Sequence, residues 1–95
     1  MSRAVAKYTE KPEAAEVVAL RAKNLRRLRN ARKLSARELA QNSDGMSPSY
    51  IYEMENNRAP LASLRTLGRL AKGFRMAPAD LLAELDRPIA PPVLL

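Results

Sequence analysis

The chain has 95 residues, which is enough for one small domain and too few for two. It carries 17 Lys and Arg against 10 Asp and Glu, and this net charge of +7 favours a polyanionic partner. Because the sequence contains neither Cys nor His, disulfides, thiolate nucleophiles, imidazole bases and ordinary zinc sites are excluded. We therefore expect no cofactor, no metal and no enzymatic activity.

Membrane insertion and secretion are not expected from the pattern of apolar residues. No stretch approaches the roughly 20 apolar residues that span a bilayer. The segment 1–7 lacks the apolar core of a secretory signal, so the predicted location is the cytoplasm, and the nucleoid if the chain comes from a bacterium or phage.

The first half of the chain is predicted to form an arm followed by two helices. Residues 1–13 are polar and partly basic, which indicates a flexible arm. Residues 14–33 lack Gly and Pro and predict a first helix, whose apolar stripe is Val18, Leu25, Leu28, Ala31 and then Leu34. Ser35 and Glu38 form a capping-box pattern that predicts a second helix from Ala36 to about Asn42.

A tight turn and a third helix come next. Gly45 supplies the left-handed conformation that the turn needs, and Met46 is expected to point inward. Ser47 as N-cap and Pro48 at the first helical position predict a helix that runs to about Asn56. Asn57 is then expected to take a positive φ.

Two further helices complete a predicted all-α domain of five helices, residues 14–86. The fourth begins after Ser63 and is expected to end at Gly73, and the fifth begins at Pro78. No segment alternates in the manner of a β-strand. The Pro-rich, apolar tail, residues 87–95, is either a frayed end or a segment that docks on a partner subunit or another protein.

Basic residues are concentrated in the first and fourth helices. Residues 19–33 contain seven and no acid, and residues 65–75 contain four and no acid, whereas residues 35–60 have a net charge of −2. The basic stretches are either solvated helix faces or a polyanion-binding surface. Because like charges repel, we favour binding of a polyanion.

The segments Leu34–Ala40 and Gly45–Arg58 resemble the Cro/cI-type helix-turn-helix family, also called XRE, and the resemblance extends from about residue 20 to residue 85. It implies a compact lambda-repressor-like domain with a helix-turn-helix unit at about residues 36–56. In that family the second helix braces the phosphate backbone and the third enters the major groove. Independently of the family, a helix, a Gly turn and a capped helix on a basic body form a DNA-binding pattern.

The resemblance also implies roles for individual residues. Ala40 and Ile51 would be structural, and Arg29 would pair with a partly buried Glu55, unless both are ordinary surface charges. The residues at base-reading positions are Ser49, Tyr52 and Glu53. Those at phosphate-contacting positions are Arg37, Ser47, Asn56, Arg58 and Tyr50, of which Tyr50 would equally suit packing on neighbouring helices.

The sequence departs from the family pattern at several positions. Pro48 and Ala36 stand where many members carry a base-reading and a phosphate-binding side chain, Asp44 adds a residue to the turn, and the loop 59–62 lacks basic residues. We therefore expect affinity to depend on the first and fourth helices and on the arm, through Arg3, Lys7 and Lys11.

The favoured function is a transcriptional regulator that binds double-stranded DNA sequence-specifically, as a homodimeric repressor on an inverted-repeat operator. Two alternatives remain open. One is the antitoxin of a toxin–antitoxin pair that autoregulates its operon, and the other is a protein-interaction module that reads DNA weakly, for which Pro48 and the acidic third helix are the best support.

Overall fold

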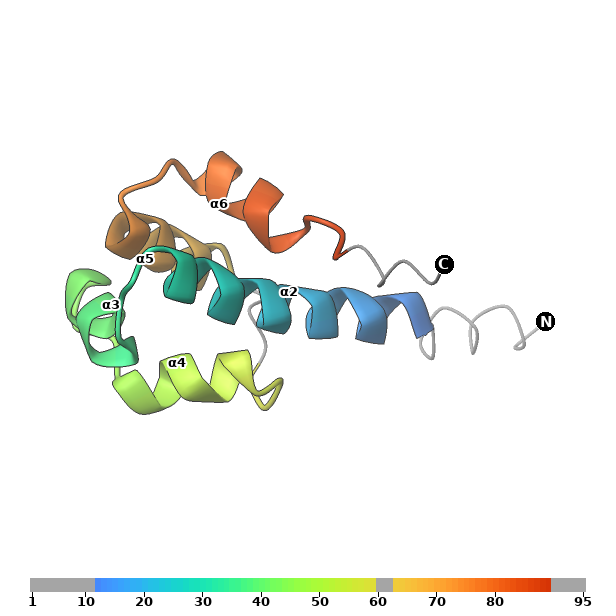
Figure 1. Cartoon of the computed structure of the whole chain (residues 1–95), viewed down its shortest axis with the longest axis horizontal. Coiled ribbons are helices and arrows are strands. Elements are labelled where there is room, and N and C mark those ends of the chain that lie inside the picture. Colours follow the sequence, from blue (N-terminus) through green and yellow to red (C-terminus); the bar gives the residue numbers. More distant parts are fainter. Residues whose placement is uncertain (1–11, 60–62, 90–95) are drawn as a thin grey trace, which may run out of the picture.

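A computed structural model describes residues 12–59 and 63–89, which form five helices (Figure 1). No strand occurs among these residues, so the all-α prediction is confirmed. The helices are α2 (Pro12–Ala31), α3 (Ala36–Asn42), α4 (Pro48–Glu55), α5 (Leu64–Phe74) and α6 (Pro78–Leu85). In Figure 1, α4 lies along one side of the long α2, while α5 and α6 lie on the other side.

The predicted helix starts are confirmed where a cap or a proline marks them. At α3 the Ser35 Oγ accepts from the Glu38 N–H at 3.0 Å, and the Glu38 Oε1 accepts from the Ser35 N–H at 2.9 Å. Ser47 caps α4 and Ser63 caps α5, each by accepting a backbone N–H. Pro48 and Pro78 stand in the first turns of α4 and α6, where a missing N–H costs no hydrogen bond.

Three predicted boundaries are wrong. α2 begins at Pro12, two residues before the expected start, and it ends at Ala31 because Lys33 takes a φ of 55°. α5 does not end at Gly73 but continues to Phe74, and the left-handed cap is Arg75 with a φ of 59°. Arg75 and Lys33 thus adopt the left-handed conformation at a helix end, where Gly or Asn was expected.

Gly73 has a packing role in place of the predicted capping role. It is buried inside α5, and an added Cβ would overlap the Ser43 Oγ and stand 3.0 Å from the Leu39 Cδ1. Both contacts belong to α3 and its C-cap. The missing side chain therefore lets α5 approach α3 closely, which brings the helix-turn-helix unit against the body of the domain.

The core confirms most of the predicted apolar positions and corrects two. Leu25, Leu28 and Met46 are buried as expected. The predicted stripe of the first helix is wrong at Val18, which is 40% exposed, and at Ala31, which is exposed, whereas Leu34 packs against the core as expected. Leu64 at the start of α5 is 85% exposed. The remaining core side chains come from all five helices: Ala22, Ala36, Leu39, Ala40, Ile51, Met54, Leu70, Ala71, Phe74, Leu81 and Leu85.

The described helices contain no candidate for crossing a bilayer, since none of them combines the necessary length with sufficient apolar character.

Candidate nucleic-acid interface

The outer face of α4 carries the residues that the sequence assigned to base reading. Ser49, Tyr52 and Glu53 are exposed and, together with Asn56, follow the spacing of one helical face. The opposite face is buried through Ile51 and Met54. The helix therefore presents a continuous polar surface to solvent while its apolar side holds it on the domain.

The start of α4 is fixed by a turn that permits little variation. Asp44 and Gly45 are both left-handed, with φ values of 58° and 72°, and Met46 packs into the core. The Ser47 Oγ accepts from the Ser49 N–H at 3.1 Å. A hydroxyl that accepts at a cap still has its own hydrogen, so Ser47 can also donate to a phosphate.

Asp44, the additional residue of the turn, is tied to α5. The Lys72 Nζ lies 2.5 Å from the Asp44 Oδ1, and this hydrogen bond lowers the pKa of the Asp44 carboxyl below its usual value. The extra residue is thus accommodated by a left-handed backbone and an ion pair across the α3–α5 packing.

A buried ion pair connects α4 to α2. The Glu55 side chain is completely buried, and the Arg29 side chain is 11% exposed. The Arg29 Nε and one terminal nitrogen donate to the two Glu55 oxygens at 2.5 Å and 2.9 Å. These hydrogen bonds raise the pKa of Arg29, against the lowering effect of burial. The other terminal nitrogen of Arg29 donates to the Leu34 carbonyl at 3.0 Å.

This pair changes the charge that α4 presents to solvent. With Glu55 buried, Glu53 is the one carboxylate on the exposed surface of α4. A bound phosphate backbone would therefore meet a far less acidic helix than the net charge of the segment suggests.

Arg26 forms a second connection between α2 and α4 that the sequence did not indicate. It donates to the Glu55 Oε1 at 3.4 Å and to the Asn56 Oδ1 at 2.9 Å. The Asn56 Nδ2 in turn donates to the Tyr52 carbonyl at 2.9 Å. Asn56 is exposed, but its amide already holds the end of α4, and only one of its N–H hydrogens remains for a phosphate.

The two tyrosines of α4 occupy different environments. The Arg29 guanidinium carbon lies 5.8 Å from the centre of the Tyr52 ring, within the range of a cation–π contact, and Tyr52 is 49% exposed. Tyr50 is half-buried and packs against the hydrophobic core. The geometry therefore favours packing for Tyr50 and leaves Tyr52 as the aromatic ring at the surface.

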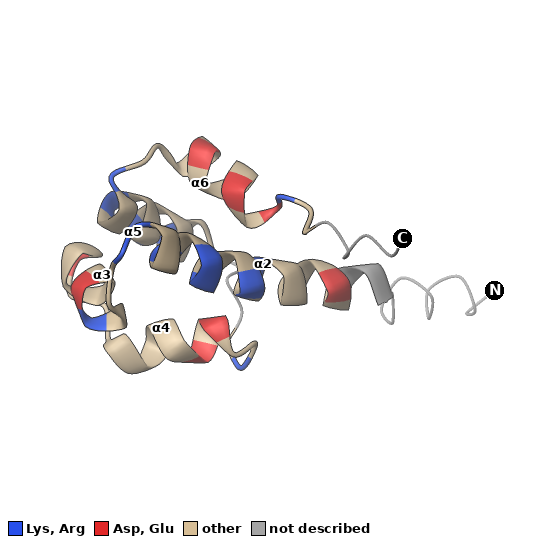
Figure 2. Cartoon of the chain, in the orientation of Figure 1, with Lys and Arg blue, Asp and Glu red and all other residues tan. Residues whose placement is uncertain are grey.

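Two exposed arginines, Arg37 and Arg58, precede and follow α4 in the chain. Arg37 is in the first turn of α3, and Arg58 follows α4, where its backbone N–H donates to the Glu53 carbonyl at 2.8 Å. Among the described residues, neither side chain has a hydrogen-bond or ion-pair partner. Figure 2 shows basic segments in α3 and in the turn after α4, with little basic colour on α4 itself.

The structural positions and two departures from the family pattern are also located. Ala40 and Ile51 are completely buried on α3 and α4. Ala36 is 1% exposed and belongs to the core, and its methyl group offers no donor to a phosphate. Pro48 is exposed at the start of α4 and offers no side-chain donor.

The repulsion expected among the basic residues of the first helix is reduced by acidic side chains that the sequence pattern did not place there. Four of the seven have acidic partners from distant parts of the chain. Arg21 contacts Asp86 at 2.6 Å, Arg27 contacts Glu84 at 3.1 Å, and Arg26 and Arg29 share Glu55. Three carboxylates, from α4, α6 and the residue after α6, therefore neutralise part of this charge, while Lys23, Arg32 and Lys33 have no ion-pair partner among the described residues.

Asn24 is a further structural residue that the sequence did not reveal. It is completely buried, and its Nδ2 donates to the Leu85 and Arg87 carbonyls at 2.7 Å and 2.8 Å. Its Oδ1 accepts from the Arg27 Nε at 3.0 Å. Asn24 thus closes the carboxyl end of α6 against α2.

Several expectations fall outside the described residues. These are the basic arm with Arg3, Lys7 and Lys11, the loop 60–62 and the tail 90–95. Within residues 12–59 and 63–89, no group of three or more acidic side chains is arranged to hold a metal ion.

Comparison with known proteins places the chain in a family. Residues 22–85, which are 64 of the 95 residues, match the model of a family described as a helix-turn-helix domain. No curated protein and no solved structure matches the chain. The matched segment begins in α2, ends with α6 and contains α3, the turn and α4. The chain therefore belongs to this family of helix-turn-helix DNA-binding domains.

Proposed function

We propose that the protein is a Cro/cI-type transcriptional regulator that reads double-stranded DNA by placing α4 in the major groove. The observation that carries the proposal is the division of α4 into a buried side and a polar exposed side, with Glu55 neutralised by arginines of α2. A helix of this kind is held rigidly while its outer side chains remain available to base edges.

The proposal assigns sequence reading to Ser49, Tyr52 and Glu53. A carboxylate accepts a hydrogen bond from the cytosine amino group, a serine bonds in either sense, and an aromatic ring packs against a thymine methyl group. The Arg29 guanidinium under the Tyr52 ring supports this assignment, because it limits the orientations that the exposed ring adopts.

Phosphate contacts are assigned to Arg37, Ser47 and Arg58, with a smaller part for Asn56. Ser47, Asn56 and Arg58 flank α4, and Arg37 lies on the preceding helix α3; all four would set the register of α4 in the groove without carrying sequence information. Tyr50 is assigned to packing, because its ring lies against the core.

The biological role that follows is repression by a homodimer on an inverted-repeat operator in the cytoplasm. Two-fold symmetric proteins match the symmetry of inverted repeats, and occupancy of a promoter by such a dimer blocks transcription. Arg21 and Arg27 of α2 are already paired with acids of the same chain, so the proposal does not assign them to DNA. The proposed reading surface is centred on α4, with Arg37 and Arg58 beside it.

An electrophoretic titration of duplex DNA at several salt concentrations tests this function. We expect steep salt dependence, and the Arg37→Ala and Arg58→Ala variants should each weaken binding to all duplexes and reduce the salt slope by about one unit. Arg87→Ala is the matched control, since this exposed arginine pairs with Glu84 at the far side of α2. Absence of binding to any duplex near physiological salt would favour a protein-interaction module.

A further inference from the structure

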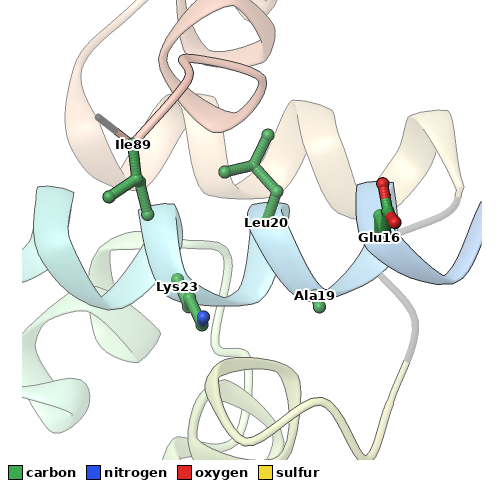
Figure 3. A pocket seen from close by; sticks show the side chains of 5 residues that line it. All are labelled: Glu16, Ala19, Leu20, Lys23 and Ile89. Carbon is green, nitrogen blue, oxygen red and sulfur yellow. The ribbon is translucent and has the colours of Figure 1, made fainter. Parts of the chain in front are cut away.

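The first half of α2 carries a surface strip that the described helices leave uncovered. A shallow hollow of about 330 Å³ lies beside this part of the helix and is lined by Glu16, Ala19, Leu20, Lys23 and Ile89, whose side chains are drawn in Figure 3. Four of these residues recur at the spacing of one helical face, and Ile89 faces them from the segment after α6.

Part of this region is more apolar than a solvent-facing helix normally is. Within the strip Ile89 is 49% exposed, while Val17 and Val18, 41% and 40% exposed, lie on other faces of the same part of α2. In Figure 1 the beginning of α2 projects past the ends of α4 and α6. The helix therefore extends an apolar surface beyond the part that the core of this chain covers.

The charges at the two ends of the strip are opposite and have no partner among the described residues. Glu16 and Lys23 form none of the ion pairs found in residues 12–59 and 63–89, although most other basic residues of α2 do. They lie seven residues apart, about 10.5 Å along the helix axis, with Ala19 and Leu20 midway between them.

This order is self-complementary. If two copies of α2 pack antiparallel about a two-fold axis between residues 19 and 20, Glu16 lies opposite Lys23 of the partner subunit, and the reciprocal pair forms at the other end. The small side chain of Ala19 permits a close approach of the two helices, and Leu20 and Ile89 supply apolar contact around the axis. A partner with a different sequence would need a matching order of charges, whereas a second copy provides it automatically.

We propose that the strip formed by Glu16, Ala19, Leu20, Lys23 and Ile89 is the interface through which two copies of this chain associate. This inference names the interface of the homodimer in the proposed function. It depends on the proposed function only for the statement that the dimer binds a two-fold symmetric operator. With five residues on each protomer, the interface belongs to the small class that gives weak, concentration-dependent dimers.

Sedimentation velocity of the full chain over a range of concentrations, with charge-reversed variants, tests the interface. Glu16→Lys and Lys23→Glu should each weaken self-association at least tenfold, because each places like charges opposite one another twice. An equimolar mixture of the two variants should associate again, since both contacts between the two different chains are then attractive. The double variant should also dimerise. Asp80→Lys, which reverses an exposed acid on α6, is the matched control and should dimerise like the parent.

Three results would overturn the proposal: a parent chain that stays monomeric at millimolar concentration, single variants that associate like the parent, or a mixture that fails to recover. If removal of residues 90–95 abolishes association while the charge variants do not, the tail and not the strip is the interface. Binding to a single half-site duplex separates this inference from the proposed function, because monomeric variants should still bind a half-site if α4 reads DNA.

Discussion

The buried pair between Arg29 and Glu55 makes the sharpest prediction about stability. In Glu55→Gln the side chain keeps its size but loses its charge, and the Arg29 guanidinium, 11% exposed, remains in the interior without a counter-ion. Breaking a buried pair from one side costs about 3–5 kcal/mol. This loss is a large part of the total stability of about 5–15 kcal/mol of a small domain. Each kcal/mol lowers the Tm of a domain of this size by about 4 °C or more, so the Tm should fall by at least about 12 °C.

Urea unfolding followed by circular dichroism measures this effect directly. Arg26→Ala is the control, since this side chain is 49% exposed and lies 3.4 Å from the same carboxylate, so its removal should cost less than about 1 kcal/mol. Replacing both partners, as Arg29→Met with Glu55→Leu, should cost less than Glu55→Gln alone. A free energy of unfolding of Glu55→Gln within 1 kcal/mol of that of the parent would refute the role of the pair.

Three further predictions concern other parts of the domain. Gly73→Ala should destabilise the fold by about 1–3 kcal/mol in urea unfolding because its Cβ would overlap α3, whereas Gly68→Ala on the same helix meets open space and should stabilise it by up to about 1 kcal/mol; equal effects would contradict the packing argument. Asn24→Ala should cost at least about 2 kcal/mol, because two carbonyls at the end of α6 lose their donor, and a loss under 0.5 kcal/mol on the same scale would refute that role. Hydrogen bonds from the Ser35 backbone and side chain lower the pKa of Glu38, so its stabilising effect is present above the unfolded-state pKa of about 4.3 and is lost as the pH falls through the lower folded-state value. Unfolding measured between pH 5 and pH 2 should therefore show a smaller acid-induced loss for Glu38→Gln, and identical pH profiles would disprove it.

Features determined by neighbouring residues could be predicted from the sequence. The capping box at α3, the Ser-Pro start of α4 and the positive φ of Gly45 and Asn57 depend on a few adjacent residues, and the structure has all of them. The predicted end of α5, at Gly73, was wrong because the role of this glycine depends on a distant part of the chain. A glycine near a helix end suggests a cap, but at Gly73 it serves the contact with α3, which lies 30 residues earlier in the chain.

Features that depend on tertiary contacts could not be predicted from the sequence alone. The basic character of residues 19–33 suggested a surface in need of a polyanion, but the acids that neutralise Arg21 and Arg27 lie 65 and 57 residues away. No signal in the sequence pointed to Asn24, because the carbonyls that it binds belong to Leu85 at the end of α6 and to Arg87 two residues later. The pairing of Arg29 with Glu55 was expected from family resemblance, whereas the contribution of Arg26 was not.

The exposed residues of α4 were named from the family resemblance, and their exposure on one helical face agrees with that expectation. Ser49, Tyr52 and Glu53 are exposed together on the helix, opposite Ile51 and Met54. What they bind at each position is a separate prediction, since exposure makes a side chain available and does not identify its partner.

Selection of binding sequences from a random pool of duplexes by the parent chain and by Glu53→Ala tests the central claim most directly. If the exposed face of α4 reads bases, the parent should select an inverted repeat, and Glu53→Ala should lose its preference at one position in each half-site while binding DNA with similar strength. Selected pools that are identical for the two proteins, or a parent that enriches no sequence, would contradict the account.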